Sequence, residues 1–168
     1  MLYAVLSALA IALLALDQWC KHWITVNLPL GETMPFLPGR VQLRTVHNYG
    51  AAWSSFSGQR WLLLGVTTCI MVAVVVLLVR RVVRHPLGLA ACFLILSGGI
   101  GNIIDRIRLG YVVDMFHLEV WTSYPVFNIA DSCVVVGACS GAVYYLFLYE
   151  KYDCKKDEPD GTADAPTE

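Results

Sequence analysis

Two aspartates, Asp114 and Asp131, stand in the largely apolar segments VVDMF and FNIAD, with one loop between them. A carboxylate near a bilayer is costly and therefore indicates a function. Two carboxylates that share one proton provide an acid and a base, which together can activate a water molecule for peptide hydrolysis. We interpret the two residues as a candidate catalytic dyad whose titrations are coupled.

Asp131 also has a structural interpretation. It follows Asn128 by three residues, a spacing typical of a helix that starts with Asn at the N-cap and Asp in the first turn. The positive end of a helix favours an ionised carboxylate, so capping and catalysis are compatible. Capping does not explain Asp114, which lies in the apolar string YVVDMF, an unusual place for a merely solvated aspartate.

The elements that must position this pair are apolar. Hydrophobic residues make up 57% of the 168 residues, more than in a typical soluble domain, and the mean hydropathy is +0.60. The sequence therefore predicts an integral membrane protein, and the net charge of −1 gives no sign of nucleic-acid binding. Four segments approach the ~20 residues that cross a bilayer, so we expect a membrane all-α fold with four transmembrane helices. They are residues 3–24, 61–79, 87–104 and 126–149.

These spans belong to a single integral membrane domain over residues 1–152. Between the first two spans, residues 25–60 contain VQLRTVHN, whose alternation predicts a small, outward-facing β-rich cradle. Residues 105–125 are expected to form a second outer loop. Residues 153–168 are polar and acidic and predict a disordered cytoplasmic C-terminal tail.

Basic residues set the direction of the spans. Arg80, Arg81 and Arg84 crowd the short loop between the second and third spans, and lysines follow the fourth, so both of these regions should face the cytoplasm. Both termini are then cytoplasmic, and the candidate site faces outward. The unusual polar residues of the spans all gather on that outer side: Asp17, Lys21, Asn102, Asp105, Arg106, Asp114, Asn128 and Asp131.

Asp17 and Lys21 are spaced i, i+4 and face the same way on a helix. We favour a structural ion pair for them. The alternative is a catalytic dyad of Lys21 with Ser54, Ser55 or Ser57, although no sequence feature singles out one serine.

Asp105 and Arg106 follow the run SGGIGN at the end of the third span, and two interpretations stay open for them. They form an ion pair at a helix end, or Arg106 holds a substrate carbonyl while Asp105 fixes the loop. The glycines of this run, together with Gly137 and Gly141, predict close contact between helices.

Six cysteines without a CxxC pair and four histidines without HExxH give no metal-binding pattern, so we expect no metal and no cofactor. Two other function classes remain open. Intramembrane Asp and Lys residues also occur in proton- or ion-coupled transporters. A non-catalytic packing or redox subunit would use the cysteines instead.

Five segments in order, DQWCK, NYGAA, GNIIDR, VVD and FNIAD, resemble signal peptidase II, the lipoprotein signal peptidase family, over about residues 8–148. The resemblance implies a membrane aspartyl endopeptidase with Asp114 and Asp131 as its catalytic residues. Such an enzyme removes signal peptides from diacylglyceryl-modified bacterial prolipoproteins by cutting just before the lipidated cysteine.

The resemblance also implies roles for other residues and the setting of the reaction. The substrate-binding residues would be Asn48, Gly50, Asn102, Arg106 and Asn128, and the supporting residues would be Asp17, Lys21, Asp105 and Ala130. The enzyme would be a monomer in the bacterial cytoplasmic (inner) membrane, in contact with membrane lipid. It would bind cyclic peptide inhibitors of the globomycin type.

Overall fold

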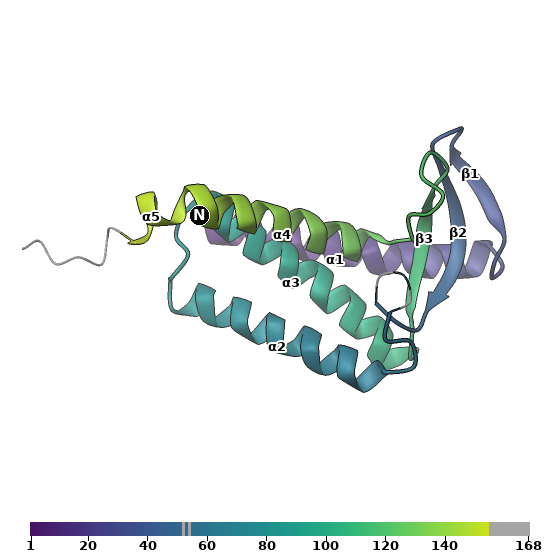
Figure 1. The fold of residues 1–168 in the computed structure, drawn as a ribbon, viewed down its shortest axis with the longest axis horizontal. Coiled ribbons are helices and arrows are strands. Elements are labelled where there is room, and N and C mark those ends of the chain that lie inside the picture. The colour runs from purple at the N-terminus through teal and green to yellow at the C-terminus, as the bar shows by residue number, and fades with distance from the viewer. Residues whose placement is uncertain (52, 54, 155–168) are drawn as a thin grey trace, which may run out of the picture.

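Four long helices lie side by side, and a small sheet stands across one end of them (Figure 1). The computed structural model describes residues 1–51, 53 and 55–154, so all but the first two residues of the tail predicted over 153–168 lie outside the described residues. The elements are α1 (Leu2–Asn27), β1 (Thr33–Leu37), β2 (Val41–Asn48), α2 (Arg60–Val79), α3 (Pro86–Arg108), β3 (Val112–Leu118), α4 (Ile129–Phe147) and the short α5 (Tyr149–Tyr152).

Each of the four long helices is long and apolar enough to cross a membrane. The shortest, α4, has 19 residues, which at ~1.5 Å per residue approaches the ~30 Å of the hydrocarbon core. The predicted four-span membrane fold is therefore confirmed. The helix ends follow local chemistry: Pro29 forces Leu28 into an extended conformation and ends α1, while Pro86 starts α3 after the N-cap His85.

The sheet has the order β1-β2-β3, with antiparallel neighbours. β2 matches the strand expected from VQLRTVHN. The second outer segment differs from the expected loop, because its residues 105–108 continue α3 and its residues 112–118 form β3. The first half of β3 is buried on both faces, so it lacks the alternation by which a half-exposed strand is recognised. Its pairing places Asp114 opposite Val46 of β2.

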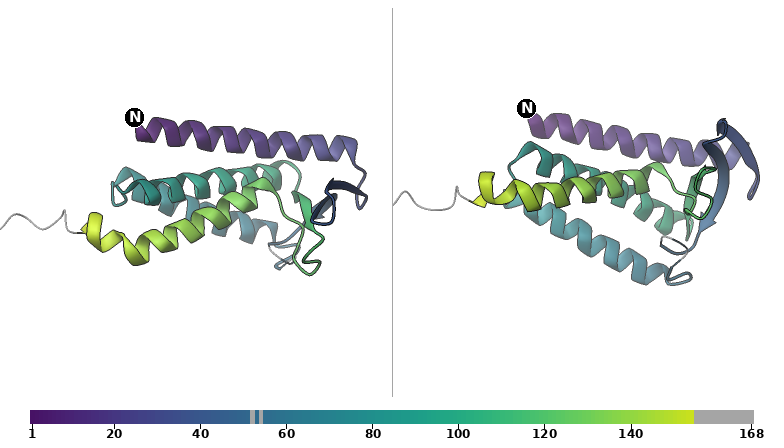
Figure 2. Two further views of the ribbon diagram at one scale, coloured as in Figure 1. Left: turned by 90° about the horizontal axis from the view of Figure 1, so that it is seen from above. Right: turned by 45° about the horizontal axis from the view of Figure 1, so that its top comes forward.

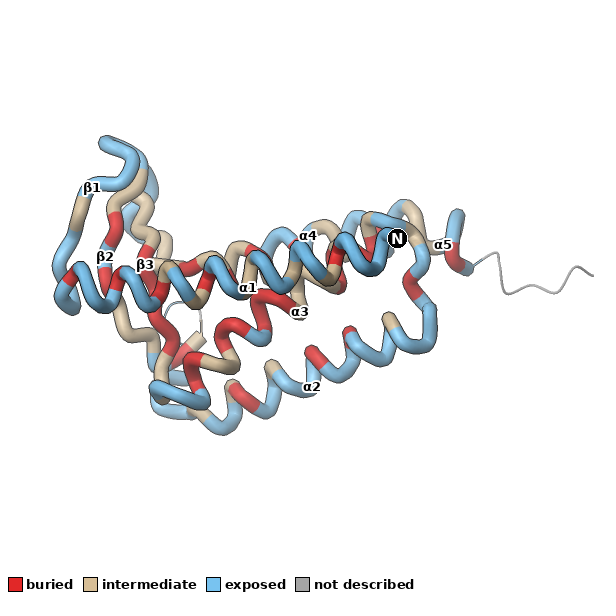
Figure 3. The backbone as a smooth tube through the Cα atoms, turned by 180° about the vertical axis from the view of Figure 1, so that it is seen from behind, coloured by how far each residue is buried: buried red, intermediate tan, exposed pale blue. Residues whose placement is uncertain are grey.

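Helix α3 is the centre of the bundle. It packs against α1, α2 and α4, as two further views show (Figure 2), and more of its residues are buried than in any other helix (Figure 3). Glycines allow this packing: Gly98 faces the Ala130 carbonyl of α4, and Gly137 of α4 faces the Ala91 carbonyl of α3. The close contact predicted from the glycine-rich run is confirmed.

Gly98→Ala is expected to destabilise the protein by about 1–3 kcal/mol, because overpacked contacts force the backbone apart. A Cβ at this position would lie 2.2 Å from the Ala130 carbonyl oxygen. Gly65→Ala on α2 is the matched control, since a Cβ there meets nothing within 4 Å and alanine favours a helix. Thermal unfolding in detergent compares the two variants, and equal midpoints would contradict the expected clash.

Asp153 closes the end of the bundle opposite the sheet. Its Oδ2 accepts hydrogen bonds from the backbone N–H groups of Arg84 and His85, each at 3.1 Å, and from the Tyr144 hydroxyl. Asp153 is buried, although the sequence placed it at the start of the polar tail. Its carboxylate ties the segment after α5 to the turn between α2 and α3.

Candidate functional site

Asp114 and Asp131 come from different elements and meet at Asn128. Asp114 lies on β3, and Asp131 lies in the first turn of α4. The Asn128 side chain donates from Nδ2 to Asp114 Oδ1 at 2.7 Å. Asn128 and Asp131 also form a capping box, in which Asn128 Oδ1 accepts from the Asp131 N–H at 2.8 Å and Asp131 Oδ2 accepts from the Asn128 N–H at 3.3 Å. The predicted cap is confirmed, and the capping residue contacts both aspartates.

The other carboxylate oxygen of each aspartate accepts from a second asparagine. Asn48 Nδ2, from the end of β2, donates to Asp114 Oδ2 at 3.0 Å. Asn102 Nδ2, from α3, donates to Asp131 Oδ1 at 2.7 Å. Three asparagines therefore fix the orientation of both carboxylates through charge-assisted hydrogen bonds.

Asp114 is 1% exposed, which disfavours its charged form. Burial, with a further contribution from the nearby Asp131 carboxylate, raises the pKa of Asp114 from 3.8 to about 7. The hydrogen bonds from Asn48 and Asn128, and the charge of Lys21, oppose this rise. The environment therefore holds a proton on Asp114 up to neutral pH.

Lys21 lies beside the pair and holds a buried charge cluster. Its Nζ contacts Asp17 Oδ2 at 2.9 Å and Asp105 Oδ2 at 3.0 Å, and donates to Asn102 Oδ1 at 3.1 Å. The structural ion pair favoured for Asp17 and Lys21 is confirmed. The Nζ is directed to two carboxylates and an amide, and no hydrogen bond found in the described residues pairs it with Ser55 or Ser57. Ser54 lies outside the described residues.

This cluster joins four elements. Asp17 of α1 accepts from the Ala130 N–H at 2.9 Å, which fixes the start of α4. Asp105 of α3 accepts from the Val113 N–H at 3.2 Å, which fixes β3 next to Asp114. Gln18, which the sequence did not single out, donates to Asp105 Oδ1 at 3.1 Å. Gln18 stands in the segment DQWCK, one of those that carry the family resemblance, but no role was predicted for it.

The Arg106 guanidinium binds a backbone carbonyl of this protein. Its Nη2 donates to the Gly50 carbonyl at 2.9 Å, and the Gly50 N–H donates to Asn48 Oδ1 at 2.9 Å. Arg106 thereby holds the backbone after β2 against α3. Through Asn48, the same contacts reach Asp114.

A cleft of about 390 Å³ opens on the two aspartates. Asn48, Asn102 and Arg106 also line it, whereas Gly50 and the fully buried Asn128 stand behind its surface. Most of the remaining wall is apolar and comes from all three neighbouring helices, which the sequence did not indicate: Leu63, Val66, Ile70 and Met71 of α2, Ile95 of α3, and Val134 and Val135 of α4.

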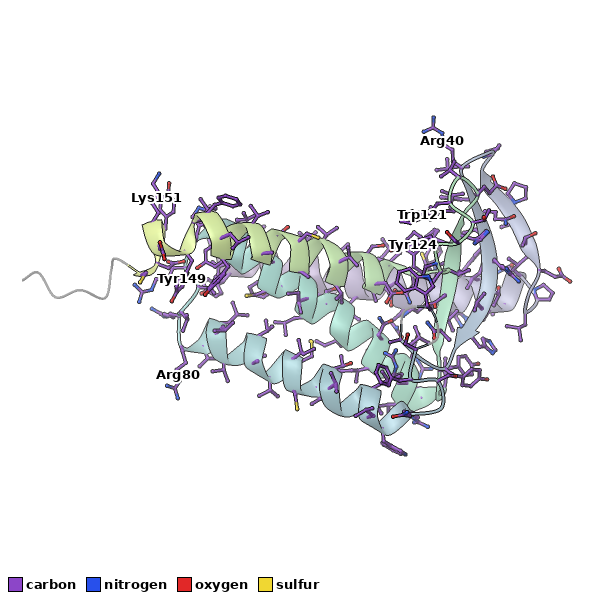
Figure 4. All side chains as sticks on the ribbon, viewed as in Figure 1. Arg40, Arg80, Trp121, Tyr124, Tyr149 and Lys151 are labelled. Atoms are coloured by element: carbon purple, nitrogen blue, oxygen red, sulfur yellow. The ribbon has the colours of Figure 1, made fainter. Side chains whose placement is uncertain are left out.

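Aromatic residues lie at the outer edge of this cleft. Tyr124 lines the cleft, and its ring stands 5.1 Å from that of Trp121 and 6.0 Å from that of Trp53. Figure 4 shows Tyr124 and Trp121 together at the sheet end of the molecule. Such rings commonly sit at the boundary between lipid and water.

The geometry combines a protonated carboxyl, a second carboxylate and an adjoining apolar cleft. It suits general acid–base chemistry on a substrate that is partly apolar. Among the described residues, no group of three or more His, Cys, Asp or Glu side chains is arranged to hold a metal ion.

Comparison with known proteins identifies similar chains. Residues 9–147 match the family described as signal peptidase (SPase) II. A lipoprotein signal peptidase of Enterococcus faecalis is 40% identical over 163 residues, which cover 95% of each chain. One of Streptococcus pyogenes serotype M6 is 42% identical over 127 residues, covering 76% of this chain and 83% of the relative.

The fold is also similar to a solved structure. A bacterial membrane enzyme, determined by the in meso method at 2.3 Å resolution, superposes with a TM-score of 0.79 and 28% sequence identity. The similarity covers 91% of this chain and 93% of that chain. Sequence and fold therefore agree over nearly the whole described molecule.

Proposed function

The chain belongs to the signal peptidase II family, and we propose that its Asp114 and Asp131 form the catalytic pair of an aspartic endopeptidase. The family is one of peptidases that remove signal peptides from prolipoproteins within a membrane. The observation that carries the proposal is the convergence of both carboxylates on one cleft, each held by two amide donors.

In the proposed mechanism, Asp114 begins as the acid because its pKa is raised to about 7. Asp131 begins as the ionised base and takes a proton from a water molecule between the carboxylates. The resulting hydroxide attacks the scissile carbonyl carbon while Asp114 donates its proton to the carbonyl oxygen. The tetrahedral intermediate then collapses: the proton on Asp131 passes to the leaving amine nitrogen and the C–N bond breaks. One hydroxyl of the intermediate returns its proton to Asp114 as the carboxyl product forms, which restores the starting state.

The other site residues receive positioning and binding roles. We assign Asn128 a positioning role, because its side chain donates to Asp114 Oδ1 and it stands behind the surface of the cleft. The substrate-binding role that the family resemblance implied for Asn128 stays a prediction. Asn48 and Asn102 line the cleft, so each orients a carboxylate and reaches a substrate backbone. Asp17, Lys21, Asp105 and Ala130 hold the scaffold through their ion pairs and hydrogen bonds, and Arg106 holds the Gly50 carbonyl.

The proposed substrate is a diacylglyceryl-modified bacterial prolipoprotein, cut just before the lipidated cysteine. The apolar cleft wall supports this choice, because acyl chains can stay in hydrocarbon while the peptide reaches the aspartates. The density of arginines at the opposite end supports a site that faces outward in the bacterial inner membrane, with both termini cytoplasmic. We propose a monomer that is inhibited by globomycin-type cyclic peptides.

Cleavage of a purified prolipoprotein tests this proposal. Wild-type enzyme should release the signal peptide from the diacylglyceryl form and leave intact the same chain whose target cysteine is replaced by serine. Proton flux into liposomes provides the contrasting measurement for a transporter. Flux without cleavage would overturn the peptidase assignment.

The raised pKa of Asp114 predicts a pH dependence. As the pH rises through about 7, Asp114 loses the proton that the mechanism requires, so kcat/KM should fall about tenfold per further pH unit. The free energy of unfolding should also fall as the pH rises, because the raised pKa lets the folded state keep a proton that the unfolded state loses. The contribution of Asp114 to stability is complete below its ordinary pKa of 3.8 and is lost as the pH rises through about 7.

Asn48→Ala provides the control for this profile. Removal of its hydrogen bond to Asp114 Oδ2 takes away a contact that favours the ionised form, so the falling limb should move to higher pH. The position of the limb does not depend on the absolute rate of the variant. A wild-type kcat/KM that stays constant between pH 6 and 9 would contradict the assigned role of Asp114.

A further inference from the structure

A second cavity, of about 440 Å³, lies in the half of the bundle farthest from the dyad. Its floor is α3 from Gly88 to Ile95, and its walls include Leu77 of α2 and Gly141 of α4. Because α2 and α4 both pack on α3, the cavity is a groove between them. It spans two helical turns, about 10 Å at 1.5 Å per residue.

The lining of this groove favours hydrocarbon. The lining consists almost entirely of aliphatic and aromatic side chains, and water does not fill an apolar cavity of this kind. An empty groove would also leave its lining without dispersion contacts. Leu77 and Tyr145 at its edges are exposed on the outside of a protein with four candidate membrane spans. The filler most available there is an acyl chain of the bilayer.

Two arginines directly adjoin groove-lining residues in the chain. Arg80 and Arg81 directly precede Val82 and Val83, which line the groove. Figure 4 shows Arg80 at the end of α2 and Tyr149 beyond α4, both at the end of the bundle opposite the sheet. Both ion pairs found among the described residues involve Lys21, so neither arginine has an acidic partner there. Guanidinium groups bind phosphate oxygens well.

We propose that this groove binds one acyl chain of an anionic phospholipid, whose phosphate is held by Arg80 and Arg81. The charge argues against the main competitor, the apolar part of a signal peptide. Signal peptides carry a positively charged region before their apolar run, which the two arginines would repel. An acidic stretch of this chain, residues 157–168, is the other competing occupant.

Native mass spectrometry of the full-length protein from detergent tests the proposal. The probes are phosphatidylglycerol and phosphatidylcholine with identical acyl chains, so that only the headgroup charge differs. We expect the wild type to retain one phosphatidylglycerol with about tenfold preference, since each basic residue near a surface strengthens anionic-lipid binding. Arg80→Gln/Arg81→Gln should remove the preference, while Arg40→Gln/Arg44→Gln, at the sheet end, should keep it.

A second pair of variants tests the groove itself. Gly141→Leu should abolish lipid retention, because a Cβ at Gly141 is 3.7 Å from Ala91 Cβ and leaves room for a side chain to fill the groove. Gly65→Leu makes the same change where a Cβ meets nothing within 4 Å, and it should retain lipid.

Three results would overturn the proposal. They are equal retention of both lipids by the wild type, displacement of the lipid by an added synthetic signal peptide, and selective binding that appears only after residues 155–168 are removed. Because these measurements need no substrate turnover, they fail or succeed independently of the proposed peptidase activity.

Discussion

Asp114→Asn and Asp131→Asn are each expected to lower kcat/KM for prolipoprotein cleavage by about 10²–10⁴-fold, the range associated with a positioned acid or base. Asparagine keeps the size of the side chain but can neither take the proton from water nor return it. Since the two aspartates act as one unit, the double variant should be little worse than either single variant. The measurement is signal-peptide release from a diacylglyceryl-modified substrate, with each variant first checked for folding.

Glu119→Gln is the matched control for these substitutions. Glu119 is an exposed acidic residue directly after β3, so the change removes a carboxylate near the sheet without touching the cleft. It should leave kcat/KM unchanged. A folded Asp114→Asn or Asp131→Asn variant with near-normal turnover would make that carboxylate structural and end the dyad assignment.

Lys21→Met is expected to destabilise the protein by about 3–5 kcal/mol, because removal of one partner leaves buried charges uncompensated. Lys21 is 3% exposed, and it is the cation between the buried carboxylates of Asp17 and Asp105. The substitution should also lower activity, because Lys21 Nζ holds the Asn102 side chain that donates to Asp131. Unfolding in mixed detergent micelles gives the free energy, and the cleavage assay gives the activity.

Two further variants separate charge from packing. Asp17→Asn/Lys21→Met/Asp105→Asn removes the cation together with both anions, so it should recover much of the stability lost in Lys21→Met. Lys151→Met changes a lysine that is exposed and stands over the Tyr152 ring, and it should change stability little. If the triple variant is no more stable than Lys21→Met, uncompensated charge is not the cause.

Local patterns in the sequence determined much of this molecule. Four apolar runs predicted the four long helices, since the thickness of a bilayer fixes the length of a span. The Asn128–Asp131 spacing predicted the start of α4, because N-capping joins residues only three apart. The alternation of residues 41–48 predicted β2 for the same local reason. Asp114 stood out because it is a carboxylate in an apolar string.

Only the tertiary structure decided how these parts meet. β3 exists because residues 112–118 pair with β2, a contact between distant segments that their own sequence does not reveal. The same pairing brings Asp114 within reach of Asn48 and Asn128, so Asp114 is buried and its pKa raised by surroundings that come from three elements. Arg106 binds the Gly50 carbonyl because the chain after β2 folds back onto α3. Sequence spacing identifies residues that can do chemistry, but burial and hydrogen-bond partners arise from long-range packing, and these give each carboxylate its role.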